Sequence, residues 1–293
     1  IVTLSSTQFG QLRRRLDGDV SLDPAIRAMY ATDASVFQIM PAAVVRPRNA
    51  EDVAAALAFC RDHGLSITAR GGGTSQAGQA IGAGLQLDFS KHLNEILEIQ
   101  PDLQRVRVQP GIVLDELNAV LKPYNQTLPL DLSTSSRATI GGMISNNSSG
   151  TRSVIYGKTI DYVESLAVMM SAGSTVTLDD ASPTTSGSQS LASQCQETVE
   201  RLAREHADEI SLRYPKILRR VGGYNLDEFI PDTDRPANLS KIVVGSEGTL
   251  ALVLEATLRL VPLPSERTLL SVQFDDLLDA LAAVPTILEH GPS

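Results

Sequence analysis

The chain has 293 residues, of which 42% are hydrophobic and 20% charged, ordinary values for a globular protein that exclude wholesale disorder. With 34 Asp and Glu against 25 Lys and Arg, the net charge is −9, and such a surface repels nucleic-acid phosphates and anionic lipid heads. Aromatic residues make up only 4% and Trp is absent. We therefore expect a core of Leu, Val, Ile and Ala, as in α/β proteins, and no nucleic-acid partner.

The cysteines and the apolar runs indicate the compartment. Cys60 and Cys195 have neither disulfide-framework nor metal-site spacing, which suits a reducing compartment and predicts no metal site. No apolar run approaches the roughly 20 residues that span a bilayer, and the start shows no signal peptide. We expect a cytoplasmic location, free or peripheral to the inner face of the membrane, without a transmembrane segment. The missing initiator Met and the end just after a predicted helix predict a piece of a longer protein.

A strand–helix–strand series follows two short helices that are predicted between residues 6 and 30. Residues 42–46 are predicted to form a strand. The next helix is capped by Asn49, runs to about His63 and is closed by a glycine. A second strand is predicted at 65–69. Such a series within about 30 residues is typical of a βαβ unit and predicts parallel pairing of its strands.

The rest of the chain alternates strands and helices around one long irregular stretch. Residues 127–158 lose periodic hydrophobicity but keep apolar anchors, which favours an ordered, functional loop. The polar residues 179–190 are predicted to be mobile. Further helices are predicted at 113–121, 191–212 and 277–288. Strands are predicted at 84–89, 94–99, 104–109, 161–171, 174–178, 241–244 and 269–274, with a hairpin at 250–261.

The first chemically informative segment is Arg70–Ser75, R-G-G-G-T-S, directly after a predicted strand. Three glycines let the backbone turn sharply, and its N–H groups with two hydroxyls can form a cradle for phosphate oxygens. It is not G-x-G-x-x-G, because Gln76 follows, and no Gly-Lys-Ser/Thr makes it a P-loop. A dinucleotide Rossmann site and a nucleotide triphosphatase are therefore disfavoured. Taken alone, a phosphate cradle and a plain turn are equal alternatives.

Two further glycine-containing segments follow. Ile140–Gly150 combines Gly141 and Gly142 with short polar side chains. As a plain surface loop it would expose three large apolar residues, which is unfavourable. Gly245–Leu250 places Glu247 between two glycines. That carboxylate can accept a ligand hydroxyl, but an exposed turn is the safer interpretation of this segment alone.

The three segments, in this order and spacing, resemble the FAD-binding domain of the vanillyl-alcohol oxidase and p-cresol methylhydroxylase (PCMH) superfamily. The resemblance runs from Pro41 to about Pro264. Within the superfamily the chain is most similar to the D-lactate, glycolate and D-2-hydroxyglutarate dehydrogenase branch, because of Gly223–Leu226 and Glu289–Ser293. The segments that carry the superfamily resemblance are Arg46–Val53, Arg70–Ser75, Thr139–Gly142, Asn147–Gly150, Tyr156 with Gly157, and Gly245–Thr249.

The resemblance implies an α+β (α/β) fold, a two-lobed PCMH-type FAD-binding domain. A helical lead-in is expected over residues 1–40. The FAD-binding domain is expected over 41–264, with one lobe at about 41–90 and the other at about 91–264. Residues 265–293 are expected to begin a C-terminal cap domain that carries the substrate side.

The resemblance also implies FAD between the lobes, with its pyrophosphate on the backbone of the first glycine turn. Some relatives attach flavin covalently through a His where this chain has Thr74, so we predict noncovalent FAD. Leu132 replaces a common Pro in the stretch with Pro129 and Asp131. The cofactor-binding residues implied are Arg70, Gly71, Gly72, Gly73, Thr74, Ser75, Gln76, Gly78, Pro129, Asp131, Thr139, Gly141, Gly142, Asn146, Ser149, Gly150, Glu247 and Gly248.

The expected chemistry is hydride transfer from a D-2-hydroxy acid such as lactate, glycolate or 2-hydroxyglutarate to flavin N5. The four histidines are scattered along the chain, so the catalytic residues are expected outside it. The resemblance implies that they come from the C-terminal cap. Tyr224 and Asn225 are a substrate-side hypothesis, against a plain turn with a packed Tyr. The electron acceptor is not identified, and some members of the branch carry an iron–sulfur region.

Two alternatives stay open. One is an NADPH-dependent reductase with the same FAD fold, which the Gly223–Leu226 segment disfavours. The other is a flavin- or nucleotide-binding module of a larger complex, without catalysis of its own. Reduction of bound flavin by NADPH would favour the first, and flavin that no 2-hydroxy acid reduces would favour the second.

Overall fold

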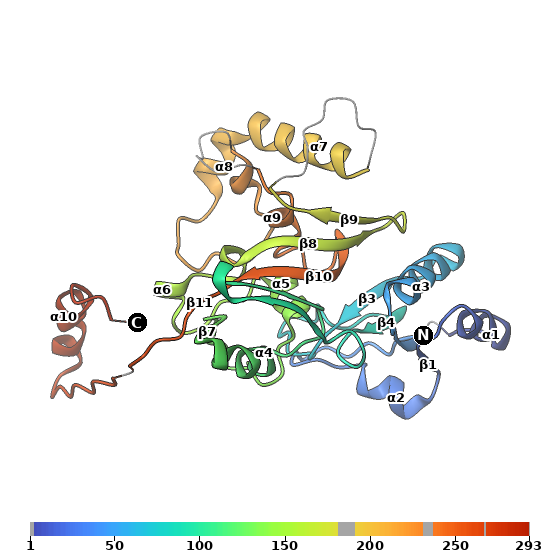
Figure 1. Cartoon of the computed structure of the whole chain (residues 1–293), viewed down its shortest axis with the longest axis horizontal. Coiled ribbons are helices and arrows are strands. Elements are labelled where there is room, and N and C mark those ends of the chain that lie inside the picture. The colour runs from blue at the N-terminus through green and yellow to red at the C-terminus, as the bar shows by residue number, and fades with distance from the viewer. Residues whose placement is uncertain (1–2, 181–190, 231–236, 267, 293) are drawn as a thin grey trace.

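The computed structural model describes residues 3–180, 191–230, 237–266 and 268–292. Two sheets with helices on their faces form the body of the chain (Figure 1), which confirms the mixed α and β class. Most of the polar segment predicted to be mobile, residues 181–190, lies outside the described residues.

The first sheet has the strand order β1-β2-β4-β3. Its strands are β1 (Asp19–Ser21), β2 (Ala43–Arg46), β3 (Ile67–Arg70) and β4 (Leu85–Asp88). β4 pairs in parallel with both β2 and β3. These two strands therefore run parallel, as predicted, but the predicted pairing between them is wrong because β4 lies between them. The antiparallel edge strand β1 was not predicted from the sequence.

Helix α3 (Ala50–His63) connects β2 and β3 as expected. The Asn49 side chain accepts the N–H of Asp52, and Gly64 ends the helix in the left-handed conformation with φ 61°, the usual signals for a helix start and stop. Its buried face, which includes Phe59, packs with Leu85 and Leu87 of β4 in one hydrophobic cluster. This cluster supports the strand from which the first glycine turn emerges.

The second sheet is antiparallel with the order β5-β6-β10-β8-β9. The hairpin predicted at 250–261 is wrong, because residues 251–259 form one long central strand. It contains no Gly, Pro or Asn at which to turn, and it pairs with β6 and β8 at once. The strands are β5 (Ile96–Gln100), β6 (Arg105–Val108), β8 (Val163–Met170), β9 (Thr175–Leu178) and β10 (Ala251–Arg259), and the short β7 (Gln126–Thr127) and β11 (Val261–Pro262) pair separately.

Helices account for the other differences from the sequence predictions. Residues 240–243 form a helical turn, not the strand predicted at 241–244, and 269–274 form no strand. The helix predicted at 191–212 is two helices that meet at His206. The helices are α1 (Ser6–Arg14), α2 (Pro24–Met29), α4 (Leu114–Leu121), α5 (Ile140–Asn146), α6 (Ser153–Tyr156), α7 (Leu191–Glu205), α8 (Ala207–Arg213), α9 (Ser240–Val243) and α10 (Leu277–Leu288).

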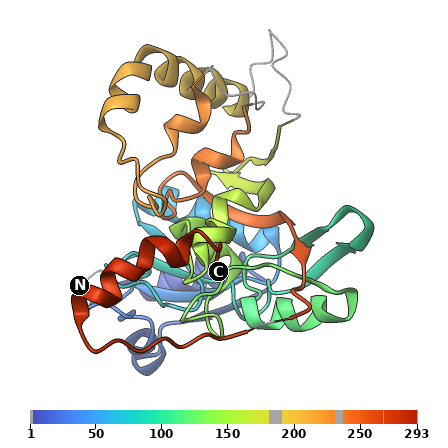
Figure 2. The same cartoon turned by 90° about the vertical axis from the view of Figure 1, so that its left-hand side faces the viewer.

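A second hydrophobic cluster joins the antiparallel sheet to α4, α5 and α9. Helix α5 lies inside the stretch predicted as a loop, and its Ile140, Met143 and Ile144 are buried. That stretch is therefore ordered, as expected, but partly helical. Helix α10 buries no side chain and is separated from the body of the chain (Figure 1). In Figure 2, which views the chain from that side, α10 runs in front of the body. No helix in the described ranges has the length and apolarity to cross a membrane.

Candidate functional site

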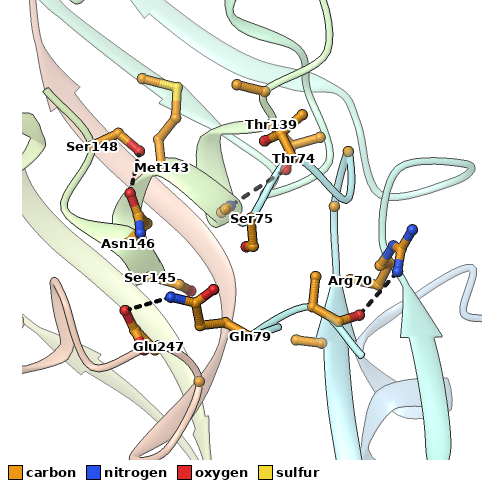
Figure 3. Close-up of a pocket in the computed structure, with 18 of the residues that line it drawn as sticks. Arg70, Thr74, Ser75, Gln79, Thr139, Met143, Ser145, Asn146, Ser148 and Glu247 are labelled. Atoms are coloured by element: carbon orange, nitrogen blue, oxygen red, sulfur yellow. Dashed lines mark hydrogen bonds between the residues drawn. The ribbon is translucent and has the colours of Figure 1, made fainter. Parts of the chain in front are cut away.

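A cavity of about 800 Å³ opens beside the C-terminal end of β3. Segments far apart in sequence line it, namely the turn after β3, the loop at 132–134 with α5, and the turn at 247–249. Figure 3 shows residues of the turn after β3, of α5 and Glu247 around the cavity. Small-ligand sites occupy about 300–1,000 Å³. The cavity therefore has room for an extended ligand of cofactor size.

The first glycine turn is packed against the segment that leads into α5. A Cβ on Gly71 would lie 2.0 Å from Thr139 Oγ1, and a Cβ on Gly72 would lie 2.1 Å from the carbonyl oxygen of Arg137. No side chain fits at such distances. The two glycines thus allow the turn to contact residues 137–139, a reason that the sequence alone did not reveal.

The backbone of this turn carries unused donors. Within the part of the chain that the structure describes, the N–H groups of Gly72 through Gln76 donate to no protein acceptor. Buried or half-buried backbone N–H groups find a partner in water, side chains or ligands, and successive free N–H groups form an anion-binding concavity. The donor set of this turn fits the phosphates of a nucleotide cofactor.

Helix α5 forms the wall opposite the turn. Thr139 caps it, and the Thr139 hydroxyl accepts the N–H of Gly142 at 3.3 Å. A Cβ on Gly141 would lie 2.6 Å from Cβ of Pro110, so this glycine also serves close packing. At the C-terminal end Asn147 takes the left-handed conformation and is buried, with its side-chain oxygen accepting the N–H of Ile160 at 3.0 Å.

The third motif is attached to the C-terminal end of α5. Gly245 N–H donates to the carbonyl of Ile144 at 2.9 Å, and Glu247 N–H donates to the carbonyl of Ser145 at 2.9 Å. These bonds satisfy carbonyls that the end of a helix leaves free. Glu247 has φ 52°, and its exposed carboxylate accepts the side-chain amide of Gln79 at 3.1 Å across the cavity (Figure 3).

Most of the cofactor-site residues expected from the sequence line this cavity. Gly78, Pro129, Asp131 and Gly150 do not. A Cβ on Gly150 would lie 2.3 Å from the carbonyl oxygen of Asp131, so these two residues pack on each other and not on the cavity. Those that line the cavity are Arg70, Gly71, Gly72, Gly73, Thr74, Ser75, Gln76, Thr139, Gly141, Gly142, Asn146, Ser149, Glu247 and Gly248.

The two substrate-side candidates differ in position. The Tyr224 hydroxyl is 2.8 Å from Oγ1 of Thr249, a residue that lines the cavity, so Tyr224 lies at its edge. Asn225 is buried, and its amide donates to the carbonyls of Lys241 at 3.2 Å and Val244 at 2.7 Å. Asn225 therefore fixes the turn of α9 and does not face the cavity.

Sequence reasoning missed several lining residues. Gln79 follows the glycine turn, and Ser145 sits inside an apolar run. Arg219 comes from the segment before Gly223, and its Nε donates to Oγ of Ser149 at 3.3 Å. The hydroxyl-rich composition of 133–149 was the available signal for some of them. The missed residues with polar side chains are Thr68, Gln79, Ser133, Thr134, Ser145, Arg219 and Thr249.

The cavity combines a row of free backbone N–H groups, many hydroxyls and an apolar floor that includes Met143 and Val253. Such a set suits a ligand with phosphates at one end, hydroxyls in the middle and a flat apolar ring. Residues 41–179 match the family described as FAD binding domain. FAD is accordingly the cofactor of the domain, as the resemblance in sequence implied.

The chain is also similar to curated enzymes along nearly its whole length. It is 37% identical over 279 residues to a D-2-hydroxyglutarate dehydrogenase of Escherichia coli, and the aligned region covers 93% of this chain and 27% of that protein. For a D-2-hydroxyglutarate dehydrogenase of Pseudomonas putida the identity is 38%, covering 94% of this chain and 28% of that protein. For the glycolate oxidase subunit GlcD of Bacillus subtilis it is 31%, covering 89% and 46%.

These relatives confirm the predicted resemblance to the dehydrogenase branch. The chain spans about a quarter of the length of the two D-2-hydroxyglutarate dehydrogenases. Among solved structures, an alkyldihydroxyacetonephosphate synthase superposes with a TM-score of 0.68 at 19% identity, covering 98% of this chain and 46% of that chain. At that identity the likeness shows the fold alone. It confirms the predicted PCMH-type architecture.

Proposed function

We propose that this chain is the flavin-binding part of an FAD-dependent dehydrogenase that oxidises a D-2-hydroxy acid. The observation that carries the proposal is the cavity in which the glycine turn, α5 and the turn at 247–249 meet, inside a domain of the FAD-binding family. Relatives named for D-2-hydroxyglutarate, D-lactate and glycolate support the substrate class. When bound, FAD supplies the hydride acceptor.

Different residues that line the cavity would contact different parts of the cofactor. The backbone N–H groups of Gly72 through Gln76 would take the pyrophosphate, where fixed dipoles offset its charges. Asn146 and Ser149, on and just after the C-terminal end of α5, would contact the ribityl chain and the ring. The α5 axis spans roughly 10 Å at 1.5 Å per residue, which suits a cofactor laid along it.

The site offers no covalent attachment through a histidine. Thr74 occupies the position of the flavin-linked His of some relatives, and none of the described residues that line the cavity is a histidine. This supports noncovalent FAD. In this proposal the general base for the hydroxyl proton comes from a cap outside the 293 residues. The electron acceptor and any iron–sulfur region lie outside them as well.

The experiment is a flavin release and reduction assay. The purified protein should be yellow, and denaturation should release all of its colour as FAD. The full-length protein, mixed without oxygen with D-lactate, glycolate or D-2-hydroxyglutarate, should lose its 450-nm absorbance with one of them. Colour that stays with the polypeptide would refute noncovalent binding. Bleaching by NADPH but by no hydroxy acid would refute the proposed reaction.

A further inference from the structure

A segment outside the matched family domain supports the glycine turn. Residues 24–40 precede the match at 41–179, yet they contact the turn or the residues just after it at three points. The Ala80 N–H donates to Oδ2 of Asp33 at 3.4 Å, and a Cβ on Gly78 would lie 3.0 Å from Phe37 Cδ2. The third contact is made by Tyr30.

Tyr30 and Gly73 enclose the side chain of Arg70. The Arg70 guanidinium lies 5.5 Å from the centroid of the Tyr30 ring, and a Cβ on Gly73 would lie 2.3 Å from its Nη2. Its Nη1 donates to the carbonyl of Ala80 at 3.0 Å (Figure 3). Arg70 therefore fills the space of a Gly73 side chain and ties the start of the turn to the loop that follows it.

Tyr30 is itself held in place from the first sheet. Its hydroxyl donates to Oδ2 of Asp88 at 2.6 Å, and Arg46 Nε donates to the Tyr30 hydroxyl at 3.4 Å. Burial, followed by the bond to Asp88, raises the pKa of Tyr30. The hydroxyl thus stays protonated at neutral pH and keeps the aromatic ring oriented toward Arg70.

The charges in this group nearly cancel. Arg46 lies near the carboxylate of Asp88, and Arg70 near that of Asp33. Partial burial would raise the pKa of Asp33, but its hydrogen bonds and the charge of Arg70 lower that pKa overall. Burial lowers the pKa of Arg70, which leaves so strong a base charged at pH 7. With two cations and two anions, the group adds little net attraction for phosphate. Its effect on the turn is one of position.

We propose that Tyr30 is a positioning residue for the phosphate cradle: by holding Arg70 against Gly73, it fixes the free N–H groups of residues 72–76 in the geometry that receives the pyrophosphate. The proposal rests on the proposed flavin function. It assigns to the lead-in helix α2 and the residues after it a part in cofactor binding. A residue that only packs in the fold would affect all parts of the cofactor alike.

The test compares ligands with and without the pyrophosphate. Protein stripped of flavin is titrated with FAD, ADP and riboflavin, for the unchanged protein and for Tyr30→Leu and Tyr30→Phe. Tyr30→Leu should weaken FAD and ADP roughly tenfold, as expected for loss of a desolvated cation–π contact, and riboflavin less than about twofold. Tyr30→Phe keeps the ring and should restore most of the affinity. Tyr124→Leu, at an exposed position away from the cavity lining, is the matched control.

The outcomes separate the inference from the function. Unchanged affinity for FAD and ADP in Tyr30→Leu, or an equal loss for riboflavin, would overturn the role of Tyr30. If Tyr30→Leu does not fold, Arg70→Lys takes its place, because Lys cannot bridge Ala80 while stacked between Tyr30 and Gly73. Its selective loss of ADP supports the inference, and unaltered ADP binding rejects it. Failure of the unchanged protein to bind either FAD or ADP would instead reject the proposed function.

Discussion

At the scale of single residues, the glycines of the first turn serve two different needs. Gly71 and Gly72 have no room for a Cβ because residues 137–139 press against them. Gly73 has φ 66° and faces Arg70. The proposed flavin site is therefore built on a contact between two parts of the chain.

This gives a prediction for Gly72. Replacing it with Val should push the turn away from the Arg137 carbonyl, lower the free energy of unfolding by about 1–3 kcal/mol through overpacking, and abolish flavin retention. Urea unfolding and bound-flavin absorbance measure the two effects. Gly10→Ala, in a helix with open space around it, should stabilise the protein slightly. Full flavin occupancy in Gly72→Val would contradict the assignment of the turn.

Glu247 is the only acidic residue among the described residues that line the cavity. Its bridge to Gln79 joins the turn after β3 to the turn before β10. Glu247→Ala removes this bridge and should weaken FAD severalfold or shift its spectrum. The free energy of unfolding should change by less than about 0.5 kcal/mol, since the residue is exposed. Glu247→Gln can still bond Gln79 and is the control. Identical FAD affinity and spectrum in all three proteins would argue against a role at the site.

At the scale of elements, α3 is secured at its N-terminus by a buried carboxylate. Asp52 accepts backbone N–H groups from Asp17 at 2.7 Å, Gly18 at 2.9 Å and Arg48 at 2.8 Å. These bonds tie the lead-in to the first turn of the helix. The helix in turn covers the sheet from which β3 delivers the glycine turn.

Removing that carboxylate tests the connection. Asp52→Ala leaves three backbone donors without partners, and each unsatisfied buried donor costs about 1–3 kcal/mol, so the free energy of unfolding should fall by at least that amount. Asp52→Asn keeps one acceptor oxygen and should lose less. Denaturant unfolding of both variants supplies the comparison. Equal stability of Asp52→Ala and the unchanged protein would show that the lead-in is held by other contacts.

At the scale of the whole molecule, the core contains a tyrosine that sets an alkaline limit to stability. Burial raises the pKa of Tyr162 to about 12, although Arg259 over its ring acts in the opposite direction. Below pH 10 the tyrosine is protonated in both the folded and the unfolded protein, and its contribution is complete. Between about pH 10 and 12 the unfolded chain ionises first, so the stability falls as the pH rises.

Urea midpoints at pH 9, 10 and 11 measure this decline. Tyr162→Phe cannot ionise, so the part of the decline due to Tyr162 should disappear in that variant. A decline of the same size in Tyr162→Phe would assign it to other groups, such as Tyr30 and Tyr214, whose pKa values burial also raises.

The division into lobes near residue 90 stays a prediction. Strands β8 and β10 each contribute some residues to one hydrophobic cluster and some to the other, so both clusters include residues from beyond position 90.

The sequence by itself determined the features that depend on neighbours a few residues apart. The βαβ unit, the Asn49 cap, the Gly64 stop and the three glycine-containing segments are such features, and the family resemblance identified FAD from the last of these. The prediction of a strand at 241–244 failed because a short apolar run suits a strand and a buried helix equally. The prediction of a hairpin at 250–261 failed because pairing on both sides favours one strand.

Only the tertiary structure decided what the distant segments do to one another. Gly71 and Thr139 are adjacent in space, Gln79 and Glu247 are bonded although 168 residues apart, and no local pattern encodes either contact. The same reason explains why Asn225 is a structural residue and why Tyr30 contacts the glycine turn. Propensity and capping act within one turn or strand, whereas a binding site is formed by packing between elements.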